Sequence, residues 1–228
     1  MTPAHSIRAV VMDMDGLMLD TEGMSHLGWV RTFAEWGLPF REDQFLELVG
    51  LNVPDVRKKM LAWYGPDFPF DAVYARKIVH VDEIIAHEGI MQKPGLPEFL
   101  AAADSLGLAK AVATSTARDR AIYKLERAGL KGRFDAAACG DEITNGKPAP
   151  DIFLLAARLL HLPPEDCLAL EDSDPGVLAA RDAGMRVLII PDVKPPSPAA
   201  RAAAWEVLPD LHQAAEFLLR EMRANPPP

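Results

Sequence analysis

From Leu108 to Met222 the sequence alternates short apolar segments with longer amphipathic ones. The apolar segments have the length of buried strands, and the amphipathic segments have the length of the helices that cover them. Repeated units of this kind pair their strands in parallel and place helices on both faces of the sheet. The predicted strands are 108–114, 134–139, 167–170 and 187–190, and the predicted helices are 118–128, 151–160, 175–183 and 208–222.

A further apolar segment, Ile7–Met12, has the character of a first buried strand, and the segment 22–88 that follows it has helical periodicity and no strand pattern. The apolar face of its first helix is predicted to contain Leu27, Val30, Phe33 and Ala34. Asn52 is a suitable N-cap for a second helix, and a third begins near Asp71. The sequence therefore predicts an α/β chain in which a helical module interrupts the sheet after its first strand.

The charge balance excludes several classes of partner. The 228 residues include 33 acidic and 24 basic side chains, which give a net charge of −9 and no general attraction for nucleic acid or anionic membranes. No apolar stretch is long enough to span a membrane, and charges interrupt the apolar run near the N-terminus, which argues against a signal peptide. The two cysteines, Cys139 and Cys167, have no zinc-site spacing, so we expect reduced thiols in a cytoplasmic protein.

Polar residues follow the predicted strands where a parallel sheet binds its ligands, at the carboxyl ends of the strands. They are Asp13 and Asp15 after the first strand, Thr114 and Ser115 after the second, and Glu171, Asp172 and Ser173 after the fourth. Lys147 lies in the proline-rich joint before the helix that precedes the fourth strand. Each motif alone is typical of a turn or a helix cap, but together they place four acids, hydroxyls and one lysine at one edge.

Crowded carboxylates without histidine or cysteine favour a hard cation, and Mg²⁺ suits carboxylates combined with a phosphate. A lysine beside them can neutralise both an aspartate and a phosphate, and hydroxyls can donate to phosphate oxygens. An aspartate can itself be the nucleophile. The residues therefore predict phosphoryl transfer.

The same segments resemble the motifs of the haloacid dehalogenase superfamily of hydrolases. The segment 10–22 resembles the first motif, Thr114 the second, 147–151 the third and 170–173 the fourth. The resemblance extends over nearly the whole chain and is greatest to the β-phosphoglucomutase-like branch of phosphatases and phosphohexomutases. It implies a Rossmann-like core formed by residues 1–21 and 91–228, with an all-helical cap domain at 22–90.

The resemblance also implies a role for each motif residue. Asp13 would be the nucleophile and a Mg²⁺ ligand, and Asp15 would be the general acid/base, with its backbone carbonyl on the metal. Thr114 and Lys147 would hold the phosphoryl group, and Asp172, assisted by Glu171, would complete the metal site. The substrate-binding residues would be Thr114, Ser115, Lys147 and, in the cap, Asn52. Hinges are expected near 20–23 and 89–95, so that the cap can close over the substrate.

Two departures from the pattern concern the substrate. Where mutases of this branch carry a histidine and a cap-loop arginine, this chain has Ser25 and Val53. Both departures favour a phosphatase over a mutase, although the neighbouring His26 and Arg57 are potential substitutes. We predict a Mg²⁺-dependent phosphatase for a small phosphorylated metabolite, acting as a monomer or weak dimer without nucleic acid or membrane. The alternatives are a phosphosugar mutase and a non-catalytic phosphate-binding module.

Overall fold

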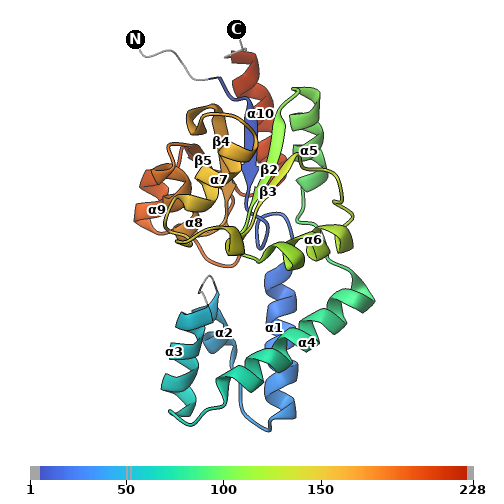
Figure 1. Ribbon diagram of the computed structural model, residues 1–228, viewed down its shortest axis with the longest axis vertical. Coiled ribbons are helices and arrows are strands. Elements are labelled where there is room, and N and C mark those ends of the chain that lie inside the picture. The colour runs from blue at the N-terminus through green and yellow to red at the C-terminus, as the bar shows by residue number, and fades with distance from the viewer. Residues whose placement is uncertain (1–5, 50, 52, 225–228) are drawn as a thin grey trace. The chain divides into compact units, whose positions relative to one another are not determined.

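The structure, a computed structural model, describes residues 6–49, 51 and 53–224. The chain divides into two compact units, one formed by residues 1–19 and 91–228 and the other by residues 20–90. We call the first the core unit and the second the cap unit, and describe each by itself (Figure 1).

The core unit contains all the strands in the described part of the chain. Its elements are β1 (Ala9–Met12), α5 (Leu96–Ser105), β2 (Ala109–Ala113), α6 (Arg118–Arg127), β3 (Ala136–Ala138), η1 (Gly140–Glu142), α7 (Asp151–Leu159), η2 (Pro164–Asp166), β4 (Cys167–Glu171), α8 (Asp174–Asp182), β5 (Arg186–Ile189), α9 (Pro198–Ala203), β6 (Glu206–Val207) and α10 (Leu211–Ala224). The cap unit contains α1 (Thr21–Glu35), α2 (Glu42–Leu48), α3 (Val53–Tyr64) and α4 (Phe70–Glu88).

The strands form one six-stranded sheet in the order β3-β2-β1-β4-β5-β6, and all the pairs are parallel. The predicted parallel sheet with surrounding helices is therefore confirmed. From β1 the chain first builds outward through β2 to β3 and then returns to place β4 on the other side of β1. A sheet of this order binds ligands at the carboxyl ends of the strands that flank this reversal.

The sheet is buried on both faces because helices cover each of them. Every residue of β1 and β4 is buried, as expected of strands with two covered faces. Alternate strand residues such as Val11 and Ala169 join a core cluster with Phe153 of α7 and Val177 of α8. Helices α5 and α10 pack together on the opposite side of the sheet (Figure 1).

Two core elements were not predicted. The prediction ended the sheet at 187–190, but β6 adds a strand beside β5, with Glu206 opposite Leu188. Two residues are too few to show an alternating pattern, so β6 is visible only through its pairing. The prediction also assigned no element to 96–105, where α5 has helix-favouring leucine and alanine and a proline in its first turn.

The interior of the cap unit is aromatic. A cluster of rings packs at centroid separations of 4.8 to 6.1 Å. This aromatic cluster consists of Trp29, Phe33, Phe40, Tyr64 and Phe68. Rings at such separations contribute both buried apolar area and favourable ring–ring contacts. The cap unit is therefore stabilised mainly by buried apolar area and by contacts between aromatic rings.

The predicted buried face of α1 was wrong in part. Leu27 and Val30 are 45% and 42% exposed, whereas the buried residues are Gly28, Trp29, Thr32 and Phe33. Thr32 can be buried because its hydroxyl donates to the Gly28 carbonyl at 2.8 Å, which satisfies this polar side chain inside the unit. Gly28 also allows close packing of α4, since a Cβ there would lie 2.6 Å from Val81.

The two segments that join the units pair with each other within the core unit. Leu19 forms an antiparallel bridge with Gln92, and the Lys93 N–H donates to the Met18 carbonyl at 2.8 Å. The chain thus leaves and re-enters the core unit at one place. Hinges at 20–23 and 89–95 remain a prediction.

Candidate active site

The sheet brings the polar strand-end residues together. Asp13 follows β1 directly, Thr114 follows β2, and Glu171 is the last residue of β4. The Asp13 N–H donates to the Leu170 carbonyl at 3.1 Å, so the pairing of β1 with β4 continues into the site. The position of the Asp13 carboxylate is therefore set by two strands of the sheet.

Lys147 joins two of the carboxylates. Its Nζ donates to Asp13 Oδ1 and to Glu171 Oε1, each at 2.5 Å, and to the Ala113 carbonyl at 3.1 Å. All three charged side chains are buried, with exposures of 9% for Asp13, 8% for Lys147 and none for Glu171. Charged groups so far from water persist only when they are paired. Lys147 thus holds Asp13 and Glu171 in fixed positions.

The site carries more negative than positive charge. Burial raises the pKa of Asp13 to about 7, with a further increase from Glu171 and an opposing effect of Lys147. Burial also raises the pKa of Asp172, and the charges of Asp13 and Glu171 add to this effect. Although burial alone would lower it, the same two charges raise the pKa of Lys147 above its ordinary value. A bound cation would offset the excess negative charge.

Glu171 is anchored on both of its oxygens. Oε1 accepts from Lys147, while Oε2 accepts from the Ser173 hydroxyl at 3.0 Å and from the Asp172 N–H at 3.2 Å. The first residues of α8 close over it, because a Cβ on Gly176 would lie 1.9 Å from Oε1. The local sequence after β4 therefore orients Glu171 and leaves room for no larger residue at Gly176.

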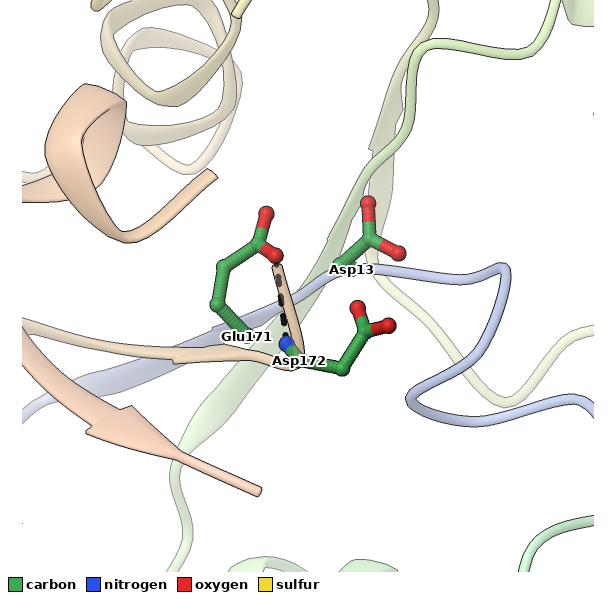
Figure 2. Close-up of side chains that lie close together, drawn as sticks. All are labelled: Asp13, Glu171 and Asp172. Carbon is green, nitrogen blue, oxygen red and sulfur yellow. Dashed lines mark hydrogen bonds between the residues drawn. The ribbon is translucent and has the colours of Figure 1, made fainter. Parts of the chain in front are cut away.

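Three carboxylates meet at this point (Figure 2). Asp13, Glu171 and Asp172 each place one oxygen within 4.8 Å of the others. Gly16, at φ +89°, passes close beside Asp172, since a Cβ there would lie 2.4 Å from Asp172 Oδ2. A set of oxygen ligands without nitrogen or sulfur matches Mg²⁺. The residues present therefore fit the predicted metal ion.

Asp15 lies in a separate group of contacts. Its Oδ2 accepts from the Thr116 hydroxyl at 2.7 Å and lies 3.5 Å from the Thr114 hydroxyl. Its Oδ1 accepts from Lys124 of α6 at 2.6 Å. Thr114 is buried, and its hydroxyl also accepts from the Thr116 N–H. Ser115 is exposed, and the hydroxyl that reaches Asp15 from this loop belongs to Thr116.

Three site residues were missing from the sequence prediction. Thr116 follows the same strand as Thr114, and its hydroxyl was an available signal. Asp192 lies after β5, so a search for polar residues at the carboxyl ends of the strands would have found it. Its Oδ1 accepts from Lys93 at 2.5 Å, and its Oδ2 faces Gly16. Lys124 lies inside a helix and gave no such signal. The predicted substrate residue Asn52 lies outside the described residues.

The cap unit has a small cavity of its own, with a volume of about 110 Å³. Its lining combines apolar, aromatic and charged groups, among them Glu22, Ser25, Trp29, Leu51, Tyr74 and Lys77. The buried Lys77 places its Nζ 5.6 Å from the centre of the Trp29 ring. The ammonium is thereby held against aromatic surface at the cavity wall.

A family model described as haloacid dehalogenase-like hydrolase matches residues 7–184 of the chain. The chain is a haloacid dehalogenase-like hydrolase. The match includes β1, the cap unit and the segments that carry Thr114, Lys147 and Asp172. The resemblance predicted from the sequence motifs is thus confirmed. No helix in the described part of this hydrolase combines the length and apolar character needed to cross a membrane.

Curated relatives include Protein CbbY of Rhodobacter capsulatus, which is 33% identical over 95% of this chain and 99% of its own. The Phosphorylated carbohydrates phosphatase of Thermotoga maritima is 33% identical over 78% of this hydrolase and 82% of its own length. Among solved structures, that of a putative beta-phosphoglucomutase from Thermotoga maritima is 27% identical with a TM-score of 0.78, covering 96% of this chain and all of the other. These relatives agree with the predicted branch of the family.

Proposed function

We propose that this hydrolase is a Mg²⁺-dependent phosphatase that acts on a small phosphorylated carbohydrate through an aspartyl-phosphate. The buried cluster of Asp13, Lys147 and Glu171 is the observation that carries the proposal. It sets one carboxylate oxygen of Asp13 against a permanent positive charge at the end of β1. The relative named Phosphorylated carbohydrates phosphatase supports this substrate class.

In the first step an Asp13 oxygen attacks the phosphorus, and the bond between phosphorus and the leaving oxygen breaks. Asp15 gives its proton to that oxygen, so that an alcohol departs rather than an alkoxide. In the second step Asp15 takes a proton from water, which attacks the same phosphorus and releases phosphate from Asp13. Lys147 and the Thr114 hydroxyl hold the phosphoryl oxygens during both steps.

Asp13 and Asp172 would hold Mg²⁺ directly, together with the backbone carbonyl of Asp15. Glu171, whose oxygens already accept hydrogen bonds, would assist by fixing Lys147 and the start of α8. When bound, the ion supplies positive charge that stabilises the transferring phosphoryl group.

Two contacts in the cap unit support hydrolysis rather than phosphosugar mutation. His26 is bound to Glu42 at 2.9 Å and lies against the Phe45 ring at 4.5 Å. Arg57 donates to Asp71 at 3.1 Å and covers the Phe70 ring. Both side chains that might replace the missing mutase residues are thus engaged within the cap unit. A bisphosphate intermediate would lack those cationic ligands.

Phosphate release from a panel of phosphorylated sugars and other metabolites, with and without excess Mg²⁺, tests the proposal. We expect release that stops when the metal is chelated. Asp13→Asn should reduce it by at least about 1,000-fold, because the nucleophile is lost. Asp182→Asn is the matched control, since Asp182 is an exposed carboxylate at the far end of α8 and pairs with Arg181.

No phosphate from any compound of the panel would contradict the proposal. Interconversion of two sugar phosphates with little phosphate released would identify a mutase instead. Binding of phosphate esters without turnover would identify a non-catalytic module.

A further inference from the structure

The Asp15 carboxylate is held from two sides by groups that the motifs of the family resemblance do not include. Lys124 Nζ donates to Oδ1 at 2.6 Å, and the Thr116 hydroxyl donates to Oδ2 at 2.7 Å. The Lys124 side chain is 15% exposed and that of Asp15 is 24% exposed. This ion pair therefore lies partly out of water, where charge-assisted hydrogen bonds are strong.

Each catalytic aspartate thus has an ammonium group of its own. Lys147, in the loop before α7, donates a hydrogen bond to Asp13, whereas Lys124, within α6, donates one to Asp15. The helix fixes the Lys124 backbone, and Ala121 and Leu125 on the same helix are buried. An ammonium presented from such an anchored element limits where the carboxylate can go.

We propose that Lys124 is a positioning residue that holds the Asp15 carboxylate in line for proton transfer to the leaving oxygen. The inference rests on the proposed role of Asp15 in phosphate ester hydrolysis. A general acid acts only when its oxygen comes within about 2.6–3.2 Å of the atom that it protonates. With Lys124 removed, Asp15 loses its ion pair on Oδ1 and keeps the threonine hydroxyls at Oδ2, so the carboxylate is held less firmly in one orientation.

The role of Lys124 can be tested by comparing substrates whose leaving groups differ in their need for a proton. An alkyl phosphate such as glycerol phosphate needs a proton on its leaving oxygen, whereas 4-nitrophenyl phosphate expels a stable anion without one. The value of kcat/KM covers the steps up to transfer onto Asp13, so the later use of Asp15 as a base does not enter. The ratio of kcat/KM for the two substrates therefore isolates proton transfer to the leaving group.

For Lys124→Met we expect kcat/KM for the alkyl phosphate to fall by about 10- to 100-fold, a part of the effect of a general acid. The value for 4-nitrophenyl phosphate should change by less than about 3-fold, which also shows that the variant is folded. Lys124→Arg, which keeps the charge, should restore most of the loss. The matched control is Lys131→Met, which removes an exposed lysine paired with Glu126.

If Lys124→Met loses activity toward both substrates, Lys124→Gln keeps a hydrogen-bond donor and gives the same comparison in a less disturbed protein. Equal losses for the two substrates in both variants would overturn the inference. A second result would also overturn the inference: Asp15→Asn selectively lowers kcat/KM for the alkyl phosphate, but Lys124→Met leaves the ratio of the two kcat/KM values unchanged. The proposed function would then still stand. Only an absence of phosphate release by the unaltered protein would overturn both.

Discussion

Charged side chains are used differently in the two units. In the core unit Lys147, Asp13 and Glu171 form ion pairs with at most 9% exposure. In the cap unit pairs such as Arg76–Glu35 lie at the surface, with 37% and 42% exposure, and the aromatic cluster fills the interior. Buried ion pairs are costly to form and costly to break, whereas exposed pairs contribute little.

The difference suggests that buried charges in the core unit serve the reaction, whereas aromatic packing in the cap unit serves stability. Buried charge fixes atoms and keeps water from screening them, which a phosphoryl-transfer site requires. Aromatic packing holds the elements of the cap unit together without a charged group in the ring cluster. If this distinction is right, disturbing a charge in the core unit should affect activity and stability together, and disturbing a ring in the cap unit should affect mainly stability.

Lys147→Met should have the largest effect. It leaves Asp13 and Glu171 buried without their cation, so the free energy of unfolding should fall by about 3–5 kcal/mol. Phosphate release should fall by at least about 100-fold, because the phosphoryl group loses a fixed positive charge. Urea denaturation and the phosphate assay measure the two effects. A variant as stable as the unaltered protein would show that the buried cluster does not depend on Lys147.

Phe33→Ala tests the other side of the comparison. Phe33 is 1% exposed in the aromatic cluster, and its truncation should lower the free energy of unfolding of the cap unit by about 3 kcal/mol. Limited proteolysis within 20–90 should become faster at the same time. Trp36→Ala is the control, since Trp36 is 41% exposed. Equal effects of the two substitutions would show that aromatic burial does not hold this unit.

Gly176→Ala should have an intermediate effect on the core unit. The added Cβ would lie 1.9 Å from Glu171 Oε1, so either α8 or Glu171 has to move. Overpacking of this kind costs about 1–3 kcal/mol. Because Glu171 binds Lys147, activity should fall as well. Gly146→Ala is the control, since a Cβ there meets nothing within 4 Å. If Gly176→Ala leaves both stability and activity unchanged, the close packing of α8 against Glu171 is not required for either.

Arg76→Met should have the smallest effect and no effect on activity at pH 7. The hydrogen bonds from Arg76 lower the pKa of Glu35 to about 2 from its ordinary value of 4.5. A lowered pKa stabilises the folded protein above the unfolded-state value and loses this contribution as the pH falls through the folded-state value. The stability difference between unaltered and Arg76→Met proteins should therefore shrink from pH 4.5 toward pH 2. A difference that grows with acid would contradict this origin.

The most accurate predictions from the sequence were those of residues at the carboxyl ends of the strands. Asp13, Thr114 and Glu171 could be placed at one edge because parallel strands align their carboxyl ends. Lys124 could not, since its contact with Asp15 joins residues 109 positions apart from the middle of a helix. The buried face of α1 was predicted only in part: Phe33 is buried as predicted, whereas the prediction did not include Thr32, whose hydroxyl is satisfied within its own helix. Periodicity describes single elements, whereas such contacts depend on how the elements pack.

The most direct test of the account is to trap phosphate on the protein. The enzyme is mixed with a phosphorylated sugar that it hydrolyses, stopped in acid within a turnover, digested and analysed by mass spectrometry. The account predicts one added phosphoryl group on the peptide that contains Asp13, and none on the same peptide from Asp13→Asn. Steady phosphate release by Asp13→Asn, or a phosphoryl group carried on any other residue, would contradict it.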